Sequence, residues 1–136
     1  MQVVSPIDVE KALADELAAR IPSASVHAAP AAPDTAAGTV VVQSMGGVQQ
    51  TPVSDEFDVV VYAYADTYGV AMTLAATVAA AIRGIEATGA VVAGIDWTTT
   101  SARPPYDDPD PDRPTLRRAT VHATVGARGI PITTDE

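Results

Sequence analysis

Residues 57–65 read Phe-Asp-Val-Val-Val-Tyr-Ala-Tyr-Ala and run without a break into Asp66-Thr67-Tyr68. β-Branched and aromatic residues dominate the stretch, so it predicts a strand with one face on a core and one mixed face. The core face carries Phe57, Val59, Val61 and Ala63, and the mixed face carries Asp58, Val60, Tyr62 and Tyr64. Asp66 is a typical helix cap, which predicts that a helix follows the strand directly.

The helix predicted from Thr67 to about Ile85 has almost no charge. Every residue from Val70 to Ile82 is apolar or threonine. Such a helix needs cover on nearly all sides, by the sheet and by either the first helix or another subunit. Its expected apolar line is Val70, Leu74, Val78 and Ile82, beside Ala71, Ala75 and Ala81.

A first helix is expected to start at Ser5-Pro6-Ile7-Asp8, with Ser5 as its cap and Pro6 in its first turn. It runs to about Arg20, because Pro22 stops it. Its buried stripe is Val9, Leu13 and Leu17, and its water-facing residues are Asp8, Lys11, Asp15, Glu16 and Arg20.

The remaining strands are predicted at residues 25–28, 39–44, 91–100 and 116–127. The last of these alternates between Thr120, His122 and Thr124 on one face and Val121, Ala123 and Val125 on the other. The pattern indicates an α+β fold, in which an antiparallel or mixed β-sheet is flanked by two helices in the order α-β-β-β-α-β-β. We expect a single domain over residues 1–128 and a free or partner-bound C-terminal arm over residues 129–136.

Composition excludes several classes of function. The 136 residues include no cysteine, so disulfides, cysteine-based metal centres and thiol chemistry are excluded. Eight basic against 17 acidic residues give a net charge of −9, which disfavours specific binding to nucleic acid or to an anionic membrane. Aromatic residues make up only 4%, so the core is thin, and shared surfaces in an oligomer would stabilise it.

No catalytic pattern stands out, and we expect no enzyme activity and no cofactor. His27 and His122, the two histidines, lie on separate predicted strands, and no Gly-x-Ser-x-Gly turn occurs. The segment from Arg103 to Pro114 holds five prolines, so no regular structure is expected there. It is either a stiff solvated loop or a weak candidate for divalent metal binding through Asp107, Asp108, Asp110 and Asp112.

Three segments are candidates for contacts with partners. The strands near residues 39–44 and 56–64 should form a hairpin, and its polar tip from Gly46 to Asp55 is the first candidate. The others are the acidic loop from Asp107 to Asp112 and the C-terminal arm from Gly129. The residues singled out are Gly46, Gly47, Gln49, Gln50, Asp108, Asp110, Asp112, Ile130 and Ile132.

Four features of the sequence resemble one known family. They are the order of elements, the opening helix from Ser5 to Arg20, the strand-to-helix junction at residues 57–68 and the proline–aspartate segment from Tyr106 to Pro114. They are similar to the tail terminator, or tail completion, proteins of long-tailed, siphovirus-type bacteriophages. The resemblance spans nearly the whole chain. The alanine-rich segment Ala28–Ala37 departs from it.

The resemblance implies a structural virion protein of the tail and neck, assembled in the host cytoplasm. Its copies would form a ring, expected to be a hexamer, that caps the head-proximal end of the tail tube and stops tube polymerisation. The implied partners are the protein itself, the tail tube protein and the head–neck connector or stopper protein. An acidic ring would let DNA pass through its lumen without specific binding.

Three alternatives remain open at this stage. One is another neck or head–tail joining protein of the same virion. Another is a soluble metal-binding domain that uses the loop from Asp107 to Asp112, and the last is a small hydrolase with an unrecognised site.

Overall fold

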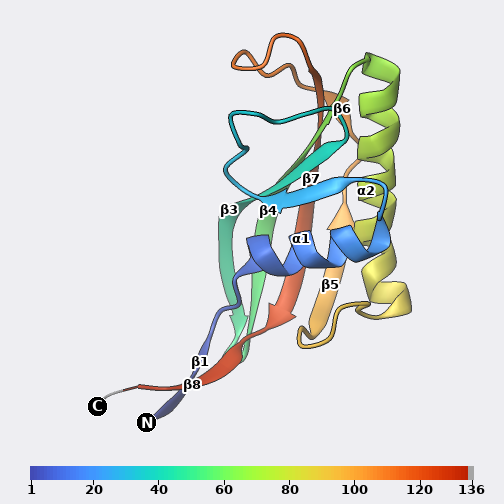
Figure 1. The fold of residues 1–136 in the computed structure, drawn as a ribbon. Coiled ribbons are helices and arrows are strands. Elements are labelled where there is room, and N and C mark those ends of the chain that lie inside the picture. Colours follow the sequence, from blue (N-terminus) through green and yellow to red (C-terminus); the bar gives the residue numbers. More distant parts are fainter. Residues whose placement is uncertain (135–136) are drawn as a thin grey trace.

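A computed structural model of the chain describes residues 1–134 (Figure 1). The chain begins with a strand, and the two helices are each inserted among strands. In chain order the elements are β1 (Gln2–Ser5), α1 (Val9–Arg20), β2 (Ser25–Ala28), β3 (Thr39–Thr51), β4 (Ser54–Ala65), α2 (Tyr68–Thr88), β5 (Trp97–Ala102), β6 (Tyr106–Asp107), β7 (Arg117–Arg128) and β8 (Ile130–Thr133).

The strands form one large mixed sheet and one small ribbon. In the large sheet the order is β2-β3-β4-β7-β5, and β6 also pairs with β7. β2 runs parallel to β3, and all the other pairs are antiparallel. β1 and β8 form a separate antiparallel pair in which the two ends of the chain lie side by side (Figure 1). The predicted α+β fold is therefore confirmed, with three short strands added.

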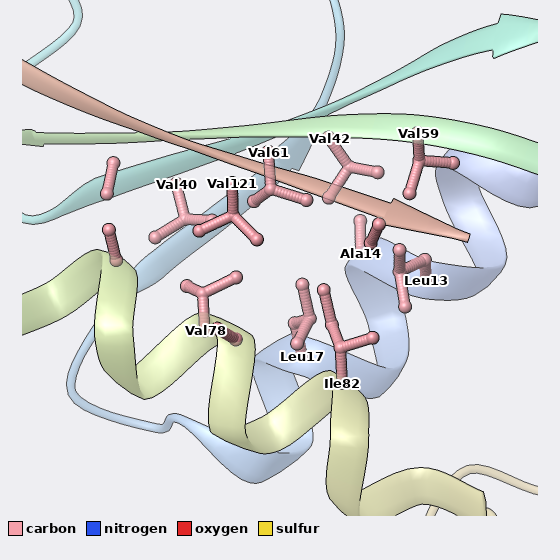
Figure 2. Packing of buried hydrophobic residues seen from close by; sticks show 14 of the residues in the cluster. Leu13, Ala14, Leu17, Val40, Val42, Val59, Val61, Val78, Ile82 and Val121 are labelled. Carbon is pink, nitrogen blue, oxygen red and sulfur yellow. The ribbon is translucent and has the colours of Figure 1, made fainter. Parts of the chain in front are cut away.

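A single core lies between the two helices and one face of the large sheet (Figure 2). The alternation predicted for residues 57–64 is confirmed, since Val59, Val61 and Ala63 point into this core. So is the alternation predicted for the last strand, whose Val121, Ala123 and Val125 lie in the same core. Figure 2 shows valines of the sheet facing Leu13 and Leu17 of α1 and Val78 and Ile82 of α2.

α2 follows β4 almost directly, as predicted, but its cap and its buried line differ. Thr67, one residue later than expected, is the N-cap and accepts a hydrogen bond from Val70 N. Val70 was expected in the core but is 60% exposed. The buried line is instead Ala71, Ala75, Val78, Ala79, Ile82 and Ile85, because α2 turns its alanines towards the sheet, where small side chains allow close approach.

α1 starts later than predicted. Asp8 is its N-cap and accepts from Lys11 N, whereas Ser5, the expected cap, ends β1. The stripe Val9, Leu13 and Leu17 is buried as predicted. Glu16 was expected to face water, but it is only 1% exposed because it binds groups from another part of the chain.

The expected polar hairpin tip is not a loop. β3 and β4 stay paired almost to their ends, so only Pro52 and Val53 form the turn. A register shift separates Ser44 from Gly47. A Cβ at Gly47 would collide with the carbonyl oxygen of Glu56 on β4, which explains why glycine stands at this irregularity.

Three further expectations from the sequence are wrong. The strand expected at residues 91–100 starts only at Trp97, because residues 89–96 form an irregular connection. The proline-rich segment contains a short strand, β6, where Tyr106 and Asp107 pair with β7. The C-terminal arm is not free within the described residues, since Ile130 pairs with Ser5 and Ile132 pairs with Val3.

Candidate interaction surfaces

Three of the four aspartates in the acidic segment from Asp107 to Asp112 pair with nearby arginines. Arg117 pairs with Asp107 at 3.6 Å, and Arg118 pairs with Asp108 at 3.2 Å. Thr120 Oγ1 donates a hydrogen bond to Asp108 Oδ2 at 2.8 Å. These contacts hold the segment against the face of the sheet that the helices leave uncovered, at the upper end in Figure 1.

Asp110 is the centre of this arrangement and is 7% exposed. Its Oδ2 accepts from the Tyr64 hydroxyl and from Arg113 Nη1, both at 3.0 Å. Its Oδ1 accepts from Asp112 N at 3.0 Å. Burial raises the pKa of the Asp110 carboxyl, but these hydrogen bonds and the charge of Arg118 outweigh it and hold the pKa below its usual value.

The aspartates proposed as metal ligands do not converge. Asp107, Asp108 and Asp110 each pair with an arginine, and Asp112 is exposed. Within residues 1–134, no three acidic or histidine side chains lie close enough to hold a metal ion. The geometry therefore does not favour the metal-binding alternative.

Replacing Asp110 with asparagine is expected to lower the free energy of unfolding by about 2 kcal/mol at pH 7, because a charge-assisted acceptor is lost. Because the folded-state pKa of Asp110 is lowered, the carboxylate stabilises the fold above its unfolded pKa of about 3.9, and this stability is lost as the pH falls. Urea unfolding at pH 7 and at pH 3 measures the effect. A difference between wild type and variant that does not shrink at pH 3 would contradict this assignment.

The other two predicted contact segments meet at the opposite end of the sheet (Figure 1). Gly129 N, just before β8, donates to the carbonyl oxygen of Val53 in the β3–β4 turn at 2.8 Å. Val4 and Gln49 line one shallow hollow beside that turn. We call this region the lower surface; it carries the exposed apolar residues Val4, Val48, Val53, Ile130 and Ile132.

The predicted contact residues therefore fall into two groups. Six of them belong to the strands that meet at the lower surface: Gly46, Gly47, Gln49, Gln50, Ile130 and Ile132. The three aspartates lie at the other end: Asp110 is buried, Asp108 is half-buried and Asp112 is exposed. The two groups are too far apart along the sheet to form one site.

Neither histidine stands in a catalytic arrangement. His27 Nε2 lies 2.7 Å from Ser25 Oγ on the edge strand β2, and among residues 1–134 no carboxylate forms an ion pair with the ring. His122 Nε2 lies 2.8 Å from the Tyr106 hydroxyl. A hollow of about 450 Å³ adjoins His122 on the uncovered sheet face, lined also by Asp58 and Arg103. Within residues 1–134, neither ring therefore has both a serine hydroxyl and a carboxylate as partners.

The outer face of α2 carries few charged residues. Only Arg83 and Glu86 are charged along the whole helix. A hollow of about 640 Å³ without any charged lining residue runs between the start of α2 and the segment Ile21–Ala24. By length and composition alone α2 is apolar enough to span a membrane, and in this fold its buried line packs on the sheet.

Two structural features escaped the sequence analysis. Glu16 looks like an ordinary surface residue of an amphipathic helix, because nothing nearby in the sequence shows that residues 91 and 92 will reach it. The pairing of the acidic segment had a visible signal, since Arg113, Arg117 and Arg118 follow the four aspartates closely. Three arginines within a few residues of four aspartates favour internal pairing.

Comparison with known proteins leaves the family open. No protein-family model matches the chain, and no curated protein matches it significantly. The functional argument therefore rests on the residues and surfaces described above.

Proposed function

We propose that this protein is a ring-forming structural component of a bacteriophage virion. Its copies would cap the head-proximal end of the tail tube and connect the tail to the head–neck connector. The observation that carries the proposal is the outer face of α2, which is apolar or neutral over most of its length and has no cover from α1 or the sheet. A neighbouring subunit would supply the missing cover.

Two further features support an assembly role. β2 and β5 are the edges of the large sheet, and open edges in a soluble protein are usually covered or blocked. The lower surface and the acidic segment lie at opposite ends of the sheet, so a ring of such subunits would present different chemistry to its two sides. We assign one side to the tail tube and the other to the connector.

The nearest alternative is another neck protein of the same virion. It would share the ring and the two chemically different ends, and would differ in which partner each end binds. Native mass spectrometry over a concentration series, with negative-stain images, tests the ring; mixing with purified tail tubes tests the position. We expect closed rings of about six subunits that bind one end of each tube.

Two results would contradict this proposal. One is a chain that stays monomeric at every concentration, both alone and with tubes. The other is a ring that binds the connector but neither binds tube ends nor limits tube length, which would favour the alternative neck protein.

A further inference from the structure

The lower part of β3 is an open edge of the large sheet. β2 pairs with β3 only over Thr39–Val42, whereas β4 pairs with β3 almost to its end. Within residues 1–134, no strand therefore pairs with the outer side of residues 43–51, which form the left margin of the sheet in Figure 1. The β5 edge is different, because α2 packs beside it and Arg83 Nε donates to the carbonyl oxygen of Ala102 at 2.9 Å.

The register of β3 and β4 shows which backbone groups this edge presents. The carbonyl oxygen of Val42 accepts from Ala29 N, so the backbone groups of Val42 point away from β4. Val42 lies opposite Val61 of β4, and hydrogen-bonding directions alternate along antiparallel strands. The residues four and six positions before Val61 have the same phase, and they lie opposite Gly47 and Gln49. The N–H and C=O groups of Gly47 and Gln49 therefore face outward.

The upper end of this edge is closed by the chain itself, and the rest is open. Ser44 N donates to the Glu10 carboxylate at 2.8 Å, and Gly46 N donates to Ser44 Oγ at 3.3 Å. Among residues 1–134, no hydrogen bond reaches the outward backbone groups of Gly47 and Gln49. The open part of the edge thus begins just after the register shift between Ser44 and Gly47.

Nothing below that shift blocks the addition of another strand. Residues 43–51 contain no proline and no charged residue, which are two of the means by which proteins protect an edge. Residues 45–51 are all exposed, including the apolar side chain of Val48. An extended segment of about five residues can therefore continue the sheet, with its backbone hydrogen-bonded to β3.

Three carboxylates surround the open edge. Glu10 lies at its upper end, and Asp55 and Glu56 of β4 lie opposite Gln49 and Val48. Among residues 1–134, none of the three carboxylates has an ion-pair partner. Asp55 lines two hollows along the edge, of about 230 and 210 Å³, and neither has a basic residue in its lining. Because neighbouring strand residues point to opposite faces, Asp55 and Glu56 make both faces of this edge acidic.

The basic residues on the neighbouring elements are already paired. Lys11 of α1 pairs with Asp15 at 2.7 Å, and Arg128 at the end of β7 pairs with Asp96 at 3.2 Å. A cation that neutralises the open edge must therefore come from another molecule. A second copy of this chain is disfavoured as that molecule, because each copy has a net charge of −9.

We propose that the edge from Gly47 to Thr51 binds an extended segment of another protein that carries lysine or arginine. The outward backbone groups of Gly47 and Gln49 supply the strand pairing, and the surrounding carboxylates supply the preference for positive charge. The inference rests on the proposed function, which expects an assembly partner at the lower surface, and it adds the chemistry of that partner.

The test uses the full-length protein and end-blocked synthetic peptides of seven residues. The basic peptide contains lysine, valine and threonine; in one control peptide glutamate replaces lysine, and in the other alternate backbone nitrogens are methylated. NMR spectra of ¹⁵N-labelled protein and amide hydrogen exchange locate the binding. We expect the basic peptide to slow exchange of the amides of Gly47 and Gln49. Each control peptide should bind at least about tenfold more weakly, because it lacks either the positive charge or the backbone donors.

Protein variants test the carboxylates. D55N/E56Q is expected to weaken binding of the basic peptide at least about fivefold. D34N/D66N removes the same charge from exposed positions outside the lower surface and should bind like wild type. Circular dichroism and thermal unfolding confirm that each variant is folded, and the glutamate peptide tests the charge preference on wild-type protein. Binding should weaken as salt rises.

Several outcomes would overturn the inference. Equal binding of the basic peptide and its methylated form would exclude strand pairing, and equal binding of the lysine and glutamate peptides would exclude the charge preference. Slow exchange of Gly47 and Gln49 in concentrated protein without peptide would identify a second copy as the occupant. Closed rings that do not bind the basic peptide would overturn the inference and leave the proposed function. A monomer that binds the peptide as expected would support the inference and contradict the proposed ring.

Discussion

Replacing Glu16 with glutamine is expected to lower the free energy of unfolding by about 3 kcal/mol at pH 7. The carboxylate is almost fully buried and accepts three hydrogen bonds: from Arg20 Nε at 2.7 Å, from Val91 N at 2.8 Å and from Val92 N at 3.1 Å. Glutamine has about the same size, but its amide group would place donors against donors. Arg20, whose side chain is 13% exposed, would lose its charge partner.

The pH dependence of this effect has a definite sign. Burial raises the pKa of the Glu16 carboxyl, but the hydrogen bonds from Arg20, Val91 and Val92 outweigh burial and leave the pKa below its usual value. A lowered folded-state pKa means that the carboxylate stabilises the fold above its unfolded pKa of about 4.3. This contribution is lost as the pH falls through the folded-state pKa. The difference between wild type and E16Q should therefore be largest near pH 7.

Urea unfolding at several pH values between 3 and 7 measures this prediction. Asp15→Asn is the matched control on the same helix, because Asp15 pairs with Lys11 at 2.7 Å but both side chains are well exposed. Its expected cost is below about 0.5 kcal/mol. Equal costs for the two variants would show that the buried contacts of Glu16 do not hold the connection at residues 89–96 in place.

Replacing Ile82 with alanine is expected to lower the free energy of unfolding by about 3–4 kcal/mol. Ile82 is fully buried where α1, α2 and the sheet meet, close to Leu17 in Figure 2. The loss combines the transfer free energy of the removed methyl groups with the cost of the cavity. The surrounding core consists largely of valine and alanine, which have few rotamers with which to fill that space.

The same helix offers a matched control. Val70 is 60% exposed at the start of α2, so Val70→Ala removes apolar atoms that are largely in water already. We expect its cost to stay within about 0.5 kcal/mol in the isolated chain. Thermal unfolding or urea titration of both variants checks the comparison. A large cost for V70A in monomeric protein would show that the start of α2 is more tightly packed than the exposed fraction indicates.

V70A also connects stability to the proposed assembly. Val70 lies in the hollow beside α2 that a neighbouring subunit would cover in a ring. Under the proposed function, its side chain would become buried on assembly and contribute to association. The variant should then leave the monomer unchanged while weakening the oligomer, which separates an interface role from a folding role.

Local patterns in the sequence were sufficient for most of the fold. The alternation in residues 57–65 identified the core face of β4, and the stripe of Val9, Leu13 and Leu17 identified the buried side of α1. These features depend on the periods of the strand and the helix, which the side chains display directly. The sequence did not determine the first residue of either helix. By residue type, Ser5 and Asp8 are equally good caps for α1, and Asp66 and Thr67 are equally good caps for α2.

The sequence by itself determined the α+β class, the core faces and the excess of acidic charge. Only the tertiary structure decided that Glu16 is buried, that Asp110 accepts hydrogen bonds from Tyr64 and Arg113, and that β1 pairs with β8. Among residues 1–134, it also leaves Arg83 and Arg103 without an ion-pair partner. The physical reason is that periodicity reports which side of an element is apolar, whereas a charge partner is set by segments that meet only after the chain has folded.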